Sequence, residues 1–348
     1  MSFDIEAQRQ ATLTLMQLPH GVLRALVGAP VSSPEGFLLD PQVQAILRLS
    51  DALGHGSWAR LGLEKARAGM ESEAQILQAR PQGALSIHDV VIRVEGGAIR
   101  ARVYRPAEAT GPLPVIVFYH GGGFVLGSLK SHDGECRELS LSVHAVVVAV
   151  DYRLAPEHKF PTPVNDAIAA YEWVAENAAS IGGDPAKMAV MGDSAGGNLS
   201  AVVARELRHH PRKPVFQLLV YPCTDMTRSK PSHRYFQEGF FLTKESIDWF
   251  LGAYLRSPDQ ETDPRASPLL AGNHQGLCPA YIVTAGFDAL RDEGRAYAEA
   301  LAEAGVRVKH RCVEGQIHGF FSMTGGLKSA RVALDEMIAA LRAELHGT

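Results

Sequence analysis

The sequence has few cysteines, and they are not spaced as metal ligands. Its four cysteines are scattered along the chain and contain no Cys-x-x-Cys pair. This scatter does not favour a disulfide framework or a structural zinc site, and free thiols are typical of a reducing compartment. We therefore expect no metal site. The four are Cys136, Cys223, Cys278 and Cys312.

An excess of positive charge and long apolar runs are also missing. Lysine and arginine number 34 against 38 acidic residues, so the net charge is −4 and no basic field attracts nucleic acid or an anionic membrane. The strongest apolar run, Ala145 to Val150, is too short to span a bilayer. The first residues lack the basic stretch and apolar run of a signal peptide. We expect a cytoplasmic protein with neither nucleic acid nor membrane as a partner.

Hydrophobic residues, 46% of the 348, are sufficient for a sizeable core, and their spacing changes near residue 85. Before that point, Gln42 to Leu53 and Leu61 to Ala79 have helical spacing, and no strand pattern appears. Beyond it, two alternating runs around Gly96-Gly97 predict an antiparallel hairpin, Val90 to Val94 and Ile99 to Tyr104.

Six further apolar runs rich in β-branched residues follow, and helical patterns separate most of them. This alternation predicts an α/β fold with an eight-stranded, mostly parallel sheet and helices on both faces. The strands are expected at Val115 to Phe118, Ala145 to Val150, Met188 to Met191, Phe216 to Tyr221, Tyr281 to Ala285 and Val306 to Val313. The helices are expected at Glu135 to Val143, Val164 to Ala179, Asn198 to Arg208, Arg291 to Ala304 and Ser329 to Leu345.

The connection between Tyr221 and Tyr281 is much longer than usual and includes a helical pattern at Lys244 to Leu255. We interpret residues 223–259 as an insertion that forms a helical cap together with the N-terminal segment, residues 1–85. Residues 86–222 and 260–348 then form the core. The insertion supplies aromatic side chains, which at helical spacing are more often core than pocket: Phe236, Phe240, Phe241, Trp249, Phe250 and Tyr254.

A Gly-x-Ser-x-Gly motif with Ser194 at its centre follows the expected strand Met188 to Met191 and precedes a helix. Such a strand–turn–helix elbow exposes the serine hydroxyl at the carboxyl edge of the sheet, with a helix N-terminus behind it. The alternative is an ordinary serine at a helix start. The context favours a nucleophile.

His120-Gly121-Gly122-Gly123 follows another expected strand. Successive glycines leave backbone N–H groups unobstructed, and with the N–H of Ala195 they can stabilise an oxyanion. A flexible loop or a phosphate cradle is the alternative. A dinucleotide fingerprint does not fit, since Leu126 occupies a required glycine position, and there is no Walker A motif. We expect no cofactor.

An acid and then a base follow the serine along the chain, in the order expected for a serine in such a strand–turn–helix elbow. Asp288 and His318 each come just after an expected strand, at the edge where Ser194 lies. Asp292 and Glu293 lie further into the following helix and are interpreted as first-turn charges. His310 is interpreted as a residue on a strand face. The ordered set Ser194, Asp288 and His318 predicts a catalytic triad.

Together these motifs resemble the hormone-sensitive-lipase-like carboxylesterases, bacterial family IV of the α/β-hydrolases. The resemblance runs from about residue 85 to the end. It is carried by His120-Gly121-Gly122-Gly123-Phe124, Asp151-Tyr152-Arg153-Leu154-Ala155-Pro156-Glu157, Phe160-Pro161, Gly192-Asp193-Ser194-Ala195-Gly196-Gly197, Asp288-Ala289-Leu290-Arg291-Asp292-Glu293-Gly294 and Ile317-His318-Gly319-Phe320.

The resemblance implies roles for these positions. Ser194 would be the nucleophile, His318 the base and Asp288 its partner. The oxyanion would be bound by the N–H groups of Gly122, Gly123 and Ala195, with His120 and Gly121 supporting the loop. It further implies short-to-medium acyl esters as small-molecule substrates. Relatives often form homodimers through the edge strand near Val306 to Val313, although these residues alone leave the oligomeric state open.

Other functions remain open on the same residues. The triad does not discriminate between leaving groups, so an amidase, peptidase or thioesterase could use it. Some members of the fold family are non-catalytic receptors that have lost a triad residue, but all three are present here. A carboxylesterase is the function we expect.

Overall fold

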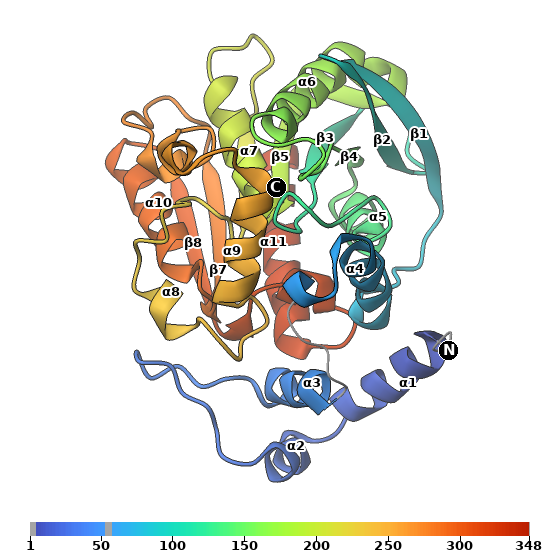
Figure 1. Ribbon diagram of the computed structural model, residues 1–348. Helices are drawn as coiled ribbons and strands as arrows, with labels where there is room; N and C mark the ends of the chain where they lie inside the picture. The colour runs from blue at the N-terminus through green and yellow to red at the C-terminus, as the bar shows by residue number, and fades with distance from the viewer. Residues whose placement is uncertain (1–4, 53–57, 348) are drawn as a thin grey trace.

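The computed structural model describes residues 5–52 and 58–347 of the chain. Its centre is one sheet of eight strands in the order β1-β2-β4-β3-β5-β6-β7-β8. In Figure 1 the sheet runs from β1 and β2 on one side to β7 and β8 on the other. The strands are β1 (Leu85–Val94), β2 (Gly97–Pro106), β3 (Leu113–Tyr119), β4 (Val146–Asp151), β5 (Gly183–Asp193), β6 (Phe216–Val220), β7 (Ala280–Phe287) and β8 (Val308–Ile317).

The predicted pairing of the strands is confirmed. β1 and β2 form the antiparallel hairpin, and all neighbours from β4 to β8 are parallel. β2 also pairs antiparallel with β4, which joins the hairpin to the parallel part. The five parallel-sheet helices expected from the sequence are present as α5 (Asp133–Val143), α6 (Thr162–Asn177), α7 (Ala195–Glu206), α10 (Arg291–Glu303) and α11 (Lys328–His346).

Alternation along the central strand β3 explains the two helical layers. Val115, Val117 and Tyr119 pack in a core with side chains of α6 and α7. Ile116 and Phe118 point to the opposite face and pack with side chains of α5 and α11. Because successive strand residues face opposite ways, an uninterrupted apolar run buries both faces of the sheet.

The N-terminal segment is helical, as expected, but contains more helices than the sequence predicted. The two predicted helices are α3 (Pro41–Ala52) and α4 (Leu63–Leu77), with a short 3₁₀ turn η1 (Trp58–Arg60) before α4; Leu53, the predicted last residue of α3, lies outside the described residues. The structure adds α1 (Ile5–Met16) and α2 (His20–Val27). Figure 1 shows α1, α2 and α3 at the end of the molecule opposite α6.

The long connection between β6 and β7 holds α8 (Ser232–Tyr235), α9 (Lys244–Tyr254), η3 (Pro258–Thr262) and η4 (Pro268–Leu270). The predicted helix of this segment is confirmed as α9. Glu245 of α9 forms an ion pair with Arg60 of η1, so the connection contacts the N-terminal segment. Two further 3₁₀ turns, η2 (Ala178–Ile181) and η5 (Phe320–Met323), complete the set of named elements.

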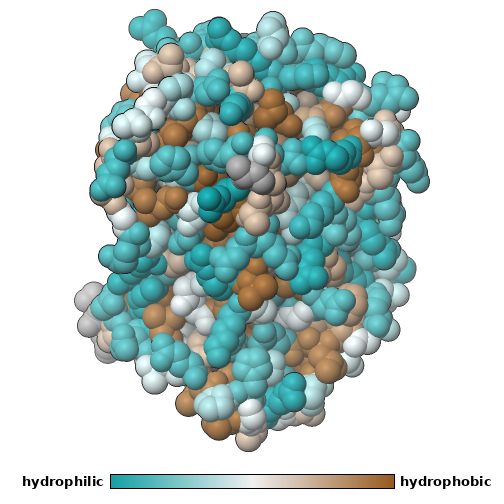
Figure 2. Space-filling view, turned by 180° about the vertical axis from the view of Figure 1, so that it is seen from behind, coloured by the Kyte–Doolittle hydropathy of each residue, from teal (hydrophilic) through white to brown (hydrophobic). Residues whose placement is uncertain are grey.

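None of the helices in residues 5–52 and 58–347 is long and apolar enough to cross a membrane. On the face seen in Figure 2, apolar residues are scattered among hydrophilic ones.

Candidate active site

Ser194 lies in the sharp turn between β5 and α7. Its φ of 54° is in the left-handed region, which is uncommon for a residue with a side chain. Its backbone N–H donates to the carbonyl of Val220 at 2.8 Å, which holds the turn against β6. At Gly196 a Cβ atom would lie closer than 3.0 Å to the carbonyl oxygen of Tyr119, so only glycine allows this approach of helix to strand.

His318 and Asp288 converge on this serine from the ends of two neighbouring strands. The Ser194 Oγ lies 2.9 Å from Nε2 of His318, and Nδ1 of the same ring lies 2.8 Å from Oδ2 of Asp288. Both His318 and Asp288 are buried, and the other Asp288 oxygen accepts the N–H of Leu290 at 2.9 Å. The structure therefore brings together the three residues that the sequence singled out.

The glycine loop after β3 lies beside the serine. Gly122 has a φ of 117°, and a Cβ there would lie closer than 3.0 Å to the carbonyl of Leu126, so this position requires glycine. Gly122, Gly123 and Ala195 all line the cavity at Ser194. Gly121 lies deeper, and its N–H donates to Oδ1 of Asp193 at 2.9 Å.

His120 is buried beneath the loop. Its ring stacks on Tyr152 with 4.4 Å between centroids, and its Nδ1 lies 2.8 Å from the carbonyl oxygen of Gly121. Burial, together with the nearby His132, lowers the pKa of His120 to about 4, so this ring is neutral at pH 7. The Tyr152 hydroxyl donates to the carbonyl of His120 at 2.7 Å, which holds the start of the loop.

The buried pair Asp193 and His132 has no role predicted from the sequence. Oδ1 of Asp193 lies 3.1 Å from Nε2 of His132, and both side chains are buried. Burial alone raises the pKa of Asp193, but His132 and the Gly121 N–H outweigh it and lower the pKa below its usual range. This pair anchors the glycine loop to the turn that carries Ser194. The feature of the sequence that could have indicated this pair is the run of three polar residues Ser131-His132-Asp133. In the structure, this run lies at the start of α5 in a buried region.

Asp292 and Glu293 lie in the first turn of α10, as interpreted, but they do more than complement its dipole. Both are buried. Glu293 accepts the N–H groups of Thr224 and Asp225 and lies 2.7 Å from Nε2 of His233. These carboxylates therefore tie the β6–β7 connection to α10. His310 lies in β8, where its Nε2 is 3.1 Å from Oγ1 of Thr284.

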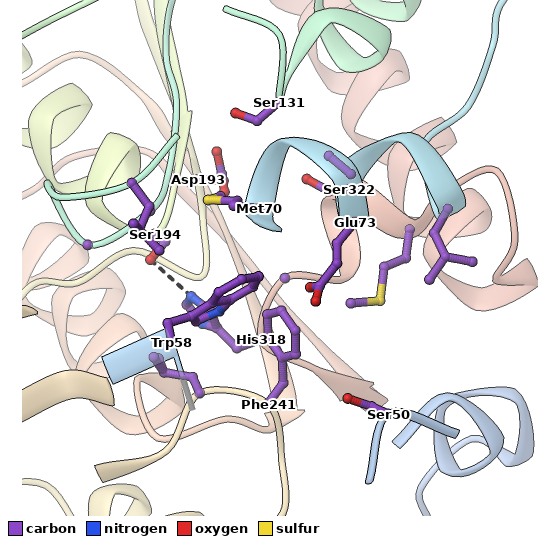
Figure 3. A pocket seen from close by; sticks show the side chains of 18 of the residues that line it. Ser50, Trp58, Met70, Glu73, Ser131, Asp193, Ser194, Phe241, His318 and Ser322 are labelled. Carbon is purple, nitrogen blue, oxygen red and sulfur yellow. Dashed lines mark hydrogen bonds between the residues drawn. The ribbon is translucent and has the colours of Figure 1, made fainter. Parts of the chain in front are cut away.

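A cavity of about 360 Å³ opens at Ser194, and its lining is mostly apolar. Figure 3 shows Ser194 and His318 joined by their hydrogen bond, with Trp58, Phe241 and Glu73 around the same space. Of the six aromatic residues expected from the β6–β7 connection, Phe241 and Phe250 line the cavity. Phe236 and Tyr254 are buried in the core instead, where Tyr254 stacks on Phe124.

The helices of the N-terminal segment supply a large part of the cavity wall. Side chains of α1, α3, η1 and α4 line it, and none of them was predicted from the sequence to do so. No sequence signal marked these positions, because their role depends on how the segment packs on the core. They include Gln8, Thr12, Ile46, Ser50, Trp58, Met70 and Glu73.

Comparison with known proteins decides the family. A profile of the α/β hydrolase fold matches residues 116–322. The chain belongs to the α/β-hydrolase fold family. Within this family the resemblance to the hormone-sensitive-lipase-like carboxylesterases is confirmed by the relatives.

These relatives span nearly the whole chain. It is 44% identical to the carboxylic ester hydrolase LipN of Mycobacterium tuberculosis (strain ATCC 25618 / H37Rv), over 89% of this chain and 84% of the relative. It is 33% identical to an ethyl acetate hydrolase of Pseudomonas putida, over 88% of this chain and 99% of the relative. A thermostable carboxylesterase cloned from a metagenomic library superposes with a TM-score of 0.78 at 44% identity, over 82% and 98% of the two chains.

Proposed function

We propose that this α/β-hydrolase is a carboxylesterase that hydrolyses short-to-medium acyl esters through an acyl-enzyme. The observation that carries the proposal is the continuous path from Ser194 Oγ through the His318 ring to Asp288, with distances of 2.9 and 2.8 Å. This is the arrangement that a serine nucleophile requires, since its hydroxyl is a weak nucleophile until a base removes the proton.

In the first half-reaction, Ser194 Oγ attacks the ester carbonyl carbon while Nε2 of His318 accepts the hydroxyl proton. Asp288, bound at Nδ1, keeps the ring oriented and stabilises the imidazolium that forms. The carbonyl oxygen becomes an oxyanion, for which Gly122, Gly123 and Ala195 offer backbone N–H groups at the cavity wall. Each such donor is typically worth about 3 kcal/mol in the transition state.

The first half-reaction ends with loss of the alcohol, and the second then repeats the same steps with water. His318 gives its proton to the leaving alcohol oxygen, the C–O bond breaks, and the acyl group remains on Ser194. A water molecule then loses a proton to His318 as it attacks the acyl carbon, and the acid leaves as Ser194 regains its proton. This chemistry uses no metal or organic cofactor.

The cavity lining supports an acyl chain of limited length as substrate. Its walls are mostly apolar, and its volume of about 360 Å³ is at the lower end for small-molecule sites. Residues 1–85 and 223–259 together act as the cap of a core formed by residues 86–222 and 260–348. Walls from both cap parts, such as Trp58 and Phe250, support this division.

Two finer points belong to the same proposal. All four cysteines, which lie within the described residues, are free thiols, in keeping with the cytoplasm as the compartment.

β8 is an edge strand, so its outer backbone groups are available to pair with β8 of a second copy in a homodimer.

A matched substrate set tests the function. The ester, thioester and amide of one butanoyl group are given to the wild type, to Ser194→Ala and to Ser180→Ala, an exposed serine that serves as control. We expect the ester to be hydrolysed fastest, and Ser194→Ala to lose a factor of about 10⁴ or more in kcat. Ser180→Ala should match the wild type.

Two results would contradict the proposal. Ester turnover that persists in Ser194→Ala would exclude Ser194 as the nucleophile. Hydrolysis of the amide alone would replace the esterase with an amidase or peptidase.

A further inference from the structure

The loop between α8 and α9 contains one residue with a strained backbone. Phe241 has a φ of 69°, in the left-handed region, and the N–H of Leu242 donates across it to the carbonyl of Phe240 at 2.8 Å. A hydrogen bond that spans one residue of positive φ forms a γ-turn of the rare, strained kind. Bulky side chains seldom adopt this conformation, and where they do, the strain often serves a functional site.

Both neighbours of Phe241 are anchored in the protein interior. The Phe240 ring packs against Phe236 and Phe287, with 5.4 Å between the ring centroids in each pair. On the other side, Leu242 is buried in the core. The anchored neighbours fix the turn, and the ring of Phe241 lines the cavity instead of joining the core.

The Phe241 ring lies in the cavity wall beside His318. A Cβ atom on Gly319, the residue after His318, would lie 3.0 Å from the ring. Figure 3 shows the ring next to His318, in the space that Ser194 faces. Phe241 is also 38% exposed, so solvent reaches this part of the wall.

The proposed reaction determines which part of an ester meets this ring. Nε2 of His318 protonates the leaving alcohol oxygen, so the alcohol group has to lie next to His318. The second aromatic ring from this connection in the cavity wall, Phe250, lies against the glycine loop instead, because a Cβ atom on Gly123 would lie closer than 3.0 Å to it. The rings of Phe241 and Phe250 therefore bound different parts of the cavity.

We propose that Phe241 contacts the alcohol group of the ester and limits its bulk. Phe241 is then a specificity-determining residue, and the preferred substrates are esters of slender primary alcohols. This inference rests on the proposed function and deepens it. It also accounts for the strained turn, since glycine at this position would relax the backbone but would remove the ring.

The test varies the alcohol and keeps the acyl group constant. Butanoates of ethanol, n-butanol and cyclohexylmethanol are all esters of primary alcohols of similar acidity, and they differ in bulk. kcat/KM is measured for each with the wild type and Phe241→Ala. Phe250→Ala removes the other ring, and Tyr235→Ala removes an exposed aromatic side chain of α8 outside the cavity wall.

We expect Phe241→Ala to raise the ratio of the cyclohexylmethyl to the ethyl ester about tenfold, with the n-butyl ester in between. Phe250→Ala and Tyr235→Ala should keep the wild-type ratio. A ratio that Phe241→Ala leaves unchanged or lowers would overturn the inference, as would an equal rise in Phe250→Ala. Hydrolysis of ethyl butanoate that depends on Ser194 would leave the proposed function standing in either case.

A second variant separates a role in the cavity from a role in the fold. Phe241→Gly removes the ring and relieves the positive φ, so its midpoint of thermal unfolding should be no lower than that of Phe241→Ala. It should raise the alcohol ratio as Phe241→Ala does. A purely structural residue would instead lower kcat/KM for all three esters together and leave the ratio unchanged, which would contradict the inference.

Binding gives the same answer where turnover is too slow to measure. In Ser194→Ala, the added change Phe241→Ala should tighten the dissociation constant of the cyclohexylmethyl ester about tenfold relative to that of the ethyl ester. Equal changes for the two esters would overturn the inference.

Discussion

Asp193 and His132 form a buried ion pair directly below the glycine loop. The side chains are only 7% and 2% exposed, so water screens their attraction little. Burial lowers the pKa of His132, but the Asp193 carboxylate outweighs this and raises it above its ordinary value. The folded protein therefore holds His132 protonated over a wider pH range than the unfolded chain does.

His132→Gln removes the cation and leaves the Asp193 carboxylate buried without it. We expect the free energy of unfolding to fall by about 3 kcal/mol near pH 6. The stabilisation from a raised pKa is fully present below the unfolded value and is lost as the pH rises through the folded value. The difference between wild type and variant should therefore shrink towards pH 9. Urea unfolding of both proteins at pH 6 and pH 9 measures it, and a difference that grows with pH would contradict the charged pair.

At the scale of elements, α9 closes one side of the cavity over the glycine loop. A Cβ atom on Gly123 would lie closer than 3.0 Å to the ring of Phe250, so the ring and the loop are in direct contact. Phe250, Leu251 and Ile247 of this helix all line the cavity. The position of α9 therefore limits the space for an acyl chain next to Ser194.

Phe250→Ala is expected to extend the range of acyl chains. Removing the ring lengthens the cavity, and each additional buried methylene contributes about 0.8 kcal/mol of binding. The kcat/KM ratio of an octanoyl to a butanoyl nitrophenyl ester should rise about tenfold. Lys244→Ala, an exposed position on the same helix and outside the cavity wall, is the control and should not change the ratio. An unchanged ratio in Phe250→Ala would show that α9 does not limit chain length.

The strands and core helices could be predicted because their signals are local. Runs such as the residues of β3 are apolar throughout, and each proposed triad residue follows a strand whose end is marked by its own motif. The helices α1 and α2 had no such signal: only Arg9 and Met16 of α1 are buried, so its apolar periodicity is weak. Trp58 and Glu73 could not be assigned to the cavity, since segments distant in sequence bring them there.

At the scale of the whole molecule, the N-terminal segment is bonded to the end of the chain. Gln42 is fully buried, and its side chain accepts the N–H of Lys328 and donates to the carbonyl of Met16. Asp40 receives the hydroxyl of Ser329 at 2.6 Å, and its N–H donates to Gly315. These bonds fix the N-terminal helices to the segment that carries His318.

Gln42→Ala should weaken this junction. It leaves the N–H of Lys328 and the buried carbonyl of Met16 without this partner, and we expect a loss of about 2 kcal/mol in the free energy of unfolding. If the N-terminal helices and the rest of the chain unfold as one unit, the midpoints measured by circular dichroism and by residual esterase activity should fall together. Gln10→Ala, an exposed glutamine of α1, should have no such effect. A variant that loses activity well before its helicity would show that the two parts unfold separately.

This junction also affects when a newly made chain can complete its fold. Residues 40 and 42 leave the ribosome long before their partners at 315, 328 and 329. The hydrogen bonds between them therefore cannot form until almost the entire polypeptide has been translated. Contacts between such distant positions form late and slowly. An interrupted translation product that lacks α11 would therefore contain the Ser194 turn and the glycine loop. The N-terminal helices that line the cavity, however, would lack their bonds to α11.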